Sequence, residues 1–154
     1  MQQQYNIVIA DTTCIILLDK IGELDLLSVM FNKVSVTKEI ADEYGKPLPA
    51  WIEIKNVTDK HYQKILETEL DIGEASAIAL YIELGDSLII LDDNKARQYA
   101  NKLQLNYTGT FGILLSAKQR GIVSSLRYLF EKIKKTNFRF SQKLLDDILK
   151  EAGE

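Results

Sequence analysis

Residues 5–13 read YNIVIADTT, a short apolar run that ends in an aspartate and two threonines. A continuous run of this kind is typical of a strand buried on both faces of a parallel sheet. Threonines are good N-cap residues, so we expect a helix to about Leu18 and, after Gly22, a second one to about Met30. Similar apolar segments, each followed by a helical pattern, occur at 33–36, 51–57, 87–91 and 105–107. This alternation predicts a three-layer α/β/α sandwich with a central parallel sheet.

The length and composition indicate one globular domain spanning 1–154. Hydrophobic residues make up 46% and charged residues 27% of the chain, close to the globular average, which argues against disorder. The single cysteine, Cys14, and the single histidine, His61, exclude an intramolecular disulfide, a cysteine-rich zinc site and a multi-histidine metal site. No apolar run reaches the ~20 residues that cross a bilayer. We therefore expect a cytoplasmic protein with no membrane partner.

The formal net charge of −3 hides a segregation of charge along the chain. Between Phe111 and Lys143 there are eight basic residues and one acid, Glu131, so this part alone carries a net charge of +7. One explanation is that its helices have a solvated lysine-rich face. The other is that this basic helical C-terminal part, from about residue 111, holds a polyanion.

Acidic residues follow the predicted strands. Asp11 follows the first strand, Glu39 lies in the first helical turn after the second, and Asp92 and Asp93 follow the segment 87–91. Glu74 opens the helical pattern of residues 73–80. Each acid alone is explained as a turn or helix-start residue, because such positions favour negative side chains. Together they predict a cluster, since the carboxyl ends of parallel strands meet at one edge of a sheet.

Clustered carboxylates repel one another, and a cation relieves that repulsion. Oxygen ligands suit the hard divalent ions Mg²⁺ and Mn²⁺. Such a site binds a phosphate oxygen and lowers the pKa of a bound water, which makes that water a nucleophile. The neighbouring basic stretch would hold the phosphodiester chain against the negative field of the cluster. An acidic cluster beside a basic flank therefore predicts a metal-dependent nuclease.

The chain resembles the PIN-domain family of metal-dependent ribonucleases. Five segments carry the resemblance in order: IVIADTTC (7–14), TKEI (37–40), LDIGEA (70–75), LDD (91–93) and TGTFGILL (108–115). The resemblance implies a strand order of 3-2-1-4-5 and cleavage of RNA that depends on Mg²⁺ or Mn²⁺. It also implies a quartet of catalytic and metal-binding acids: Asp11, Glu39, Glu74 and Asp92. Asp93 is the alternative to Asp92 as the fourth ligand.

Two further features come with this resemblance. Many relatives are toxins of type II toxin–antitoxin pairs, which a small partner protein holds inactive and which are often dimeric. The resemblance therefore implies a small antitoxin protein as a partner, and a homodimer. Glu74 is a departure, because typical members have an aspartate as the third acid, and the longer side chain changes the geometry available to a metal.

Seven further residues are candidates for contact with the substrate: Thr12, Thr13, Arg97, Thr108, Thr110, Lys118 and Arg120. The resemblance implies that Thr12 or Thr13 orients Asp11 through its hydroxyl. The threonines at 108 and 110 lie at the mouth of the last strand, where the alternative is an N-cap with glycines in a tight turn. For Arg97 the alternative is a salt bridge with Asp93. The two basic residues belong to the positively charged stretch.

Two rival functions remain open at this stage. The first is a catalytically inactive relative that binds RNA or a protein partner through the basic helices alone. The second is a phosphoacceptor or phosphohydrolase domain with a similar parallel sheet. That class generally needs two acids beside the first strand and a lysine near the last one, and the segment 11–13 supplies only one acid. We therefore rank it third.

Overall fold

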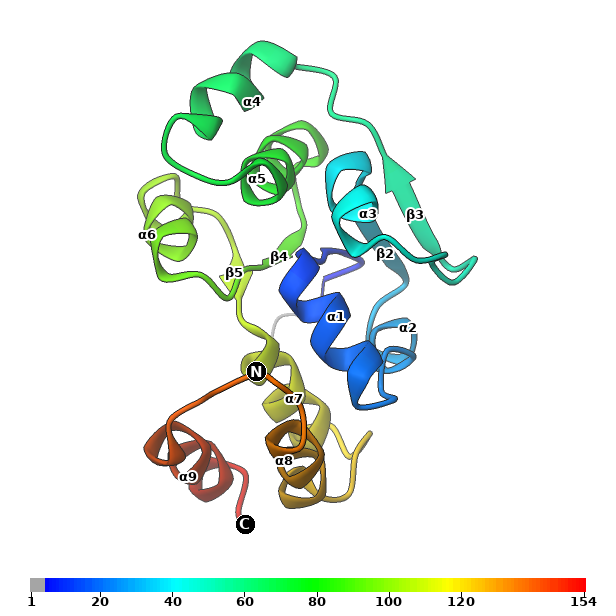
Figure 1. Ribbon diagram of the computed structural model, residues 1–154, viewed down its shortest axis with the longest axis vertical. Helices are drawn as coiled ribbons and strands as arrows, with labels where there is room; N and C mark the ends of the chain where they lie inside the picture. The colour runs from blue at the N-terminus through cyan, green and yellow to red at the C-terminus, as the bar shows by residue number, and fades with distance from the viewer. Residues whose placement is uncertain (1–4) are drawn as a thin grey trace.

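The computed structural model describes residues 5–154 and contains a five-stranded parallel sheet (Figure 1). Its strands are β1 (Ile7–Ile9), β2 (Lys33–Thr37), β3 (Ile52–Lys55), β4 (Leu88–Ile90) and β5 (Tyr107–Thr108). They are ordered β3-β2-β1-β4-β5, and every neighbouring pair is parallel. This confirms the predicted fold class and strand order. The reversal of strand order lies at β1 and β4, the point where such sheets place their functional sites.

Nine helices flank the sheet in the described part of the chain. They are α1 (Thr12–Lys20), α2 (Leu26–Met30), α3 (Lys38–Tyr44), α4 (Lys60–Glu67), α5 (Ile72–Leu84), α6 (Asn94–Lys102), α7 (Thr110–Gln119), α8 (Leu126–Lys134) and α9 (Gln142–Glu151). Figure 1 shows α8 and α9 beside α7, at the end of the molecule opposite α4. No helix within residues 5–154 is long and apolar enough to span a membrane.

Short polar side chains set where the helices begin. The side chain before the first helical residue accepts a hydrogen bond from a backbone N–H of the first turn, which satisfies a group that has no partner within the helix. Seven residues of the described chain do this: Asp11, Thr37, Asp59, Asp71, Asp93, Ser125 and Ser141. Two expected starts are wrong. Asp11 caps α1 in place of the predicted Thr12 or Thr13, which lie inside the helix, and the helix predicted from Gly22 begins at Leu26. Gly22 has a φ of +73°, outside the helical region.

The centre of the core lies between the middle strands and α5. Ile9 of β1 and Ile89 of β4 are completely buried. Helix α5 is apolar on nearly all sides, with Ala75, Ala77 and Ile78 fully buried, so it packs against the sheet and against α3 and α4. A helix packed on the sheet and on two neighbouring helices has little freedom to shift, although Ile72 and Ile82 near its ends are exposed. Its first turn is therefore held at the carboxyl edge of the strands.

Candidate active site

Asp11 joins the ends of β1 and β4. One carboxylate oxygen, Oδ1, accepts a hydrogen bond of 2.9 Å from the backbone N–H of Cys14, in the first turn of α1. The other, Oδ2, accepts one of 3.3 Å from the backbone N–H of Asp92. The residue is only 6% exposed. Backbone groups from two elements thus fix the carboxylate at the carboxyl edge of the sheet.

Asp92 is held by the start of α7. The backbone N–H of Thr110 donates to its Oδ1 over 2.8 Å, and the Thr110 hydroxyl donates to its Oδ2 over 2.6 Å. Gly109 makes this close approach possible, because a Cβ at that position would lie 3.0 Å from Asp92 Oδ1. The next residue, Asp93, instead caps α6 by accepting a hydrogen bond from the N–H of Ala96. Asp92 therefore points inward to Asp11, and Asp93 is exposed.

Glu74 lies in the first turn of α5, where Asp71 accepts a 2.8 Å hydrogen bond from its backbone N–H. Seven residues line the small pocket that this turn forms with the end of β1: Asp11, Thr12, Thr13, Glu43, Asp71, Gly73 and Glu74. The acids of this lining, together with Asp92 and Asp93, are called the acidic cluster below. The structure thus brings Asp11, Glu74 and Asp92 to one edge of the sheet.

The crowding of carboxyl groups changes their protonation. Burial, and then the charge of nearby Asp92, raises the pKa of Asp11 to about 8, against the opposing effect of its backbone hydrogen bonds. Burial, followed by the charges of Asp71 and Asp93, raises the pKa of Glu74 to about 7. Both acids therefore hold a proton more readily than isolated carboxyl groups do.

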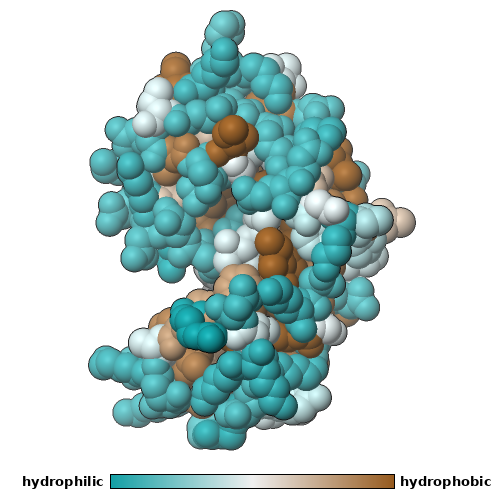
Figure 2. Space-filling view, viewed as in Figure 1, coloured by the Kyte–Doolittle hydropathy of each residue, from teal (hydrophilic) through white to brown (hydrophobic). Residues whose placement is uncertain are grey.

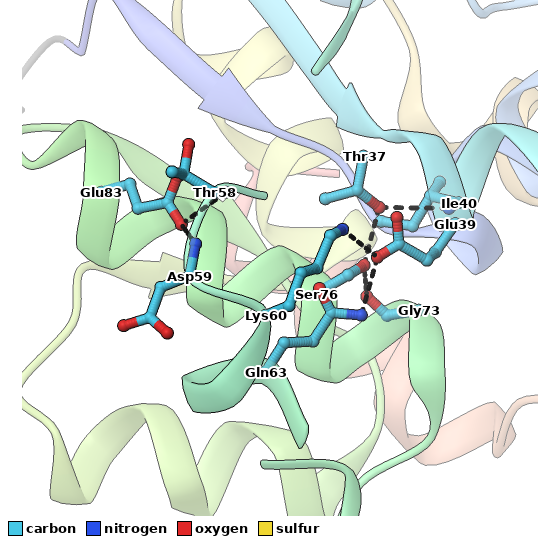
Figure 3. A network of polar contacts seen from close by, with 10 residues as sticks. All are labelled: Thr37, Glu39, Ile40, Thr58, Asp59, Lys60, Gln63, Gly73, Ser76 and Glu83. Atoms are coloured by element: carbon cyan, nitrogen blue, oxygen red, sulfur yellow. Dashed lines mark hydrogen bonds and ion pairs between the residues drawn. The ribbon is translucent and has the colours of Figure 1, made fainter. Parts of the chain in front are cut away.

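Glu39 is turned away from this cluster. Its Oε2 accepts a 2.7 Å hydrogen bond from Nε2 of Gln63 and lies 3.7 Å from the ammonium of Lys60, both on α4 (Figure 3). The buried amide of Gln63 and the ammonium of Lys60 thus bind the carboxylate of Glu39. Its position just after β2 had led us to predict this carboxylate as a metal ligand. Glu39 joins α3 to α4 instead.

Glu43 is the acid of α3 that lines the pocket, and the sequence analysis did not select it. It lies four residues after Glu39, which places both side chains on one face of the helix. Its Oε1 is 3.6 Å from the position that a Cβ of Gly73 would take. Glu43 also contributes to the raised pKa of Glu74. The signal available in the sequence was this i, i+4 spacing of two glutamates.

A buried hydroxyl pair fixes α3 against α5. The hydroxyls of Thr37 and Ser76 are 2.7 Å apart, and the Ser76 hydroxyl donates to the carbonyl of Gly73 over 2.7 Å (Figure 3). Thr37 also accepts a hydrogen bond from the N–H of Ile40 at the start of α3. The first turns of α3 and α5 are therefore joined, which sets the side on which Glu43 and Glu74 meet.

The predicted substrate contacts are spread over several places. Thr12 and Thr13 line the acidic pocket, and Thr110 holds Asp92. The guanidinium of Arg97 lies over the ring of Tyr107, with Cζ 5.4 Å from the ring centroid, and near Gly109.

The remaining three candidates lie away from the acidic pocket. Thr108 and Arg120 line a separate cavity of about 320 Å³ between α7 and the amino ends of the strands, whose wall also contains Tyr107. Lys118 donates to the carbonyl of Ser124. For Lys118 and Arg120 the physical reason is that α7 runs away from the carboxyl edge, so its last turn is about 12–15 Å from its first.

The basic C-terminal part is partly neutralised by acids of the same chain. Four of its eight cations form ion pairs of 3.3–3.5 Å: Lys118 with Glu154, Lys132 with Glu23, Lys134 with Glu131, and Lys143 with Asp147. The carboxylate of Glu154 also accepts hydrogen bonds from the first turn of α8. The positive surface is therefore narrower than the sequence suggests.

A family model described as a PIN domain matches residues 7–154. The chain belongs to the PIN-domain family. This confirms the predicted family, and the sheet order agrees with it. A search of curated proteins finds no match. Members of the PIN-domain family are generally nucleases, so this PIN domain has a nuclease-type fold with its acidic cluster at the switch point of the sheet.

The acidic cluster of the PIN domain offers oxygen donors of the kind that hard divalent cations prefer. Within residues 5–154, no three Asp, Glu, His or Cys side chains converge as a ready-made metal site. The donors nevertheless fit Mg²⁺ or Mn²⁺, because a cation would favour the charged carboxylates that burial, and then the neighbouring acids, disfavour in Asp11 and Glu74. Glu74 is half-buried and Glu43 is exposed, so their side chains have room to turn toward Asp11 and Asp92.

Proposed function

We propose that this PIN domain is an endoribonuclease that depends on Mg²⁺ or Mn²⁺. The observation that carries the proposal is the buried carboxylate of Asp11, linked to Asp92 by a backbone hydrogen bond at the carboxyl edge of β1 and β4. Burying the Asp11 carboxylate beside a second, half-buried acid costs free energy beyond what a helix cap alone requires. A functional site at this position explains the cost.

In this proposal four acids bind the cation: Asp11, Asp92, Glu74 and Glu43. Asp93 lies beside them and contributes negative charge without binding the cation directly. The cation would supply Lewis-acid activation of the phosphodiester and of water. Asp11 and Asp92 are suited to fixed positions, because backbone and hydroxyl donors orient them. Glu74 and Glu43 are suited to closing on the ion, because their side chains retain freedom. Thr12 and Thr13, at the pocket wall, are placed to meet a phosphate oxygen.

The partners belong to the same proposal. RNA is the substrate because the positive charge of the C-terminal part can offset the repulsion between phosphates and the acidic cluster. We also propose, from the resemblance to toxin-like PIN domains, that the protein acts in the cytoplasm as the toxin of a type II toxin–antitoxin pair. In that role it would form a homodimer and be held inactive by a small antitoxin.

One observation favours a second candidate, a PIN domain that binds RNA or protein without cleaving it. The acids of the described chain do not already converge on one point. An inactive module has no need of that convergence, whereas a nuclease must achieve it when the ion enters.

A metal titration combined with an RNA cleavage assay separates the two candidates. Wild-type protein should cleave a panel of single-stranded and structured RNAs with Mn²⁺, and calorimetry should detect Mn²⁺ binding. Asp11→Asn should lose both while keeping a folded circular-dichroism spectrum. Lys64→Ala, an exposed change on α4, serves as the control. Equal Mn²⁺ affinity in wild type and Asp11→Asn would rule out the assigned site, and metal binding without cleavage would favour the inactive module.

A further inference from the structure

We propose that a pocket in the turn between α8 and α9 binds a nucleobase of single-stranded RNA. This inference rests on the proposed function, because it adds a binding site for the same substrate. Six residues line the pocket, which has a volume of about 140 Å³: Ile133, Lys134, Phe138, Arg139, Phe140 and Leu145. The lining combines an apolar interior with two cations, which matches the flat apolar ring and the charged phosphate of a nucleotide.

The apolar part of the pocket is well fixed. Ile133 of α8 and Leu145 of α9 are almost fully buried and form its base. The rings of Phe138 and Phe140 are parallel within 2°, with centroids 6.3 Å apart. Phe140 in turn packs edge-on against Phe111, at 4.5 Å and 88°. Two aromatic side chains are therefore held in place before any ligand arrives, which reduces the entropy that binding must overcome.

The same aromatic contacts connect the pocket to the acidic cluster. Phe111 is the second residue of α7 and directly follows Thr110, which holds Asp92. In Figure 1 the segment between α8 and α9 lies beside α7. An RNA strand with one base in the pocket thus has a short route to the acids, along the first turn of α7. The pocket is placed to align the strand rather than to act on it.

The charge around the pocket favours a polyanion over a neutral or acidic surface. Residues 132–139 contain four cations and no acid. The exposed guanidinium of Arg139 is bonded only to the carbonyls of Thr136 and Phe138 in the contacts described, which leaves N–H groups for a phosphate. Lys20, from α1, lies over the Phe138 ring with Nζ 5.7 Å from its centroid. Two of the four cations of residues 132–139 form ion pairs, Lys132 with Glu23 and Lys134 with the exposed Glu131, whereas Lys135 and Arg139 form none in the contacts described.

Single-stranded RNA fits this arrangement better than a duplex. Unpaired bases can leave the stack and pack on aromatic side chains, whereas paired bases cannot. Figure 2 shows hydrophobic and hydrophilic side chains interleaved over the C-terminal helices, rather than one uniform apolar face. Interleaving of this kind suits alternating bases and phosphates. An apolar protein segment would gain little from Arg139 and Lys135, the cations of this stretch that form no ion pair in the contacts described.

The test measures RNA binding without metal, so that cleavage plays no part. Fluorescence anisotropy with a labelled single-stranded oligouridine, in EDTA, should show roughly tenfold weaker binding for Phe138→Leu, which keeps an apolar side chain but removes the ring. Phe138→Tyr, which keeps the ring, should bind as the parent protein does. Arg139→Ala should weaken binding and reduce its salt dependence more than Lys64→Ala, which removes the same charge on distant α4.

An abasic oligonucleotide of the same length provides the matched ligand. It should bind the parent protein and Phe138→Leu equally, because the sugar–phosphate chain has no base for the pocket. Equal affinity of parent and Phe138→Leu for oligouridine would overturn the proposal, as would binding of a peptide but no RNA. If the protein binds RNA as expected but cleaves none with Mn²⁺, the pocket stands and the nuclease function fails. If the protein cleaves RNA with Mn²⁺ but Phe138→Leu does not change RNA binding, the nuclease function stands and the pocket proposal fails.

Discussion

The side chain of Asp92 is bound by Thr110 through both of its oxygens. The backbone N–H of Thr110 donates to one oxygen over 2.8 Å, and its hydroxyl donates to the other over 2.6 Å. Thr110 itself is only 1% exposed. Hydrogen bonds from two directions leave the carboxylate one orientation. The first turn of α7 therefore fixes one acid of the cluster and, with it, the position of the helices that follow.

Thr110→Val should destabilise the protein and misplace Asp92. The change keeps the shape of the side chain but removes a buried donor to a carboxylate, a loss of about 1.5–3 kcal/mol in the free energy of unfolding. Urea denaturation measures the loss, and calorimetry should show weaker Mn²⁺ binding. Thr110→Ser, which keeps the hydroxyl, should restore both. A Val variant with unchanged stability and metal affinity would contradict this role.

Gly109→Ala should disturb the same carboxylate by contact. A new Cβ would lie 3.0 Å from Asp92 Oδ1, so this carboxylate must shift, whereas Arg97 at 3.6 Å is in ordinary contact. We expect a loss of about 1–3 kcal/mol in stability, in the range of overpacked sites, and weaker Mn²⁺ binding by calorimetry. Gly73→Ala is the matched control for stability only, because its Cβ would meet nothing closer than 3.6 Å but would lie in the acidic pocket. An equal loss of stability in the two variants would rule out the contact with Asp92 as the cause.

Asp11→Asn should stabilise the metal-free protein at high pH. The pKa of Asp11 is raised to about 8 by burial, so the folded state binds the extra proton between the unfolded value near 4 and about pH 8. Stability from this group is thus lost as the pH rises through that range, on the order of a few kcal/mol. Asparagine keeps the cap on α1 without the charge. Thermal unfolding in EDTA at pH 5 and pH 9 should show a smaller drop for the variant than for the parent, and an equal drop would contradict the assignment.

Glu43→Gln and Glu39→Gln should have different effects. Glu43 lines the acidic pocket, so its loss of charge should weaken Mn²⁺ binding with little change in stability. Glu39 contacts Gln63 and Lys60, so its change should cost about 0.5–1.5 kcal/mol of stability and leave Mn²⁺ affinity unchanged. Calorimetry and urea denaturation of both variants provide the comparison. If instead Glu39→Gln weakened Mn²⁺ binding and Glu43→Gln did not, Glu39 rather than Glu43 would be the metal ligand of α3.

Tertiary contacts decided which acid of α3 faces the pocket. The rule that strand ends carry functional residues selected Glu39, because it follows β2 most closely. Gln63, 24 residues away on α4, attracts that carboxylate, and this contact depends on how α4 packs. The partnership of Asp92 with Thr110, 18 residues later, depends in the same way on the adjacency of β4 and β5.

The sequence by itself determined the strands, most of the helix starts and the placement of Asp11, Glu74 and Asp92 next to strand ends or helix starts. These features depend on the local pattern of apolar residues and on capping by residues a few positions away. They can therefore be predicted from the sequence alone. Only the tertiary structure decided which side chains share one pocket and how many of the C-terminal cations remain unpaired. Those features arise from contacts between residues distant in sequence, because side-chain direction is set by packing and by competing hydrogen-bond partners.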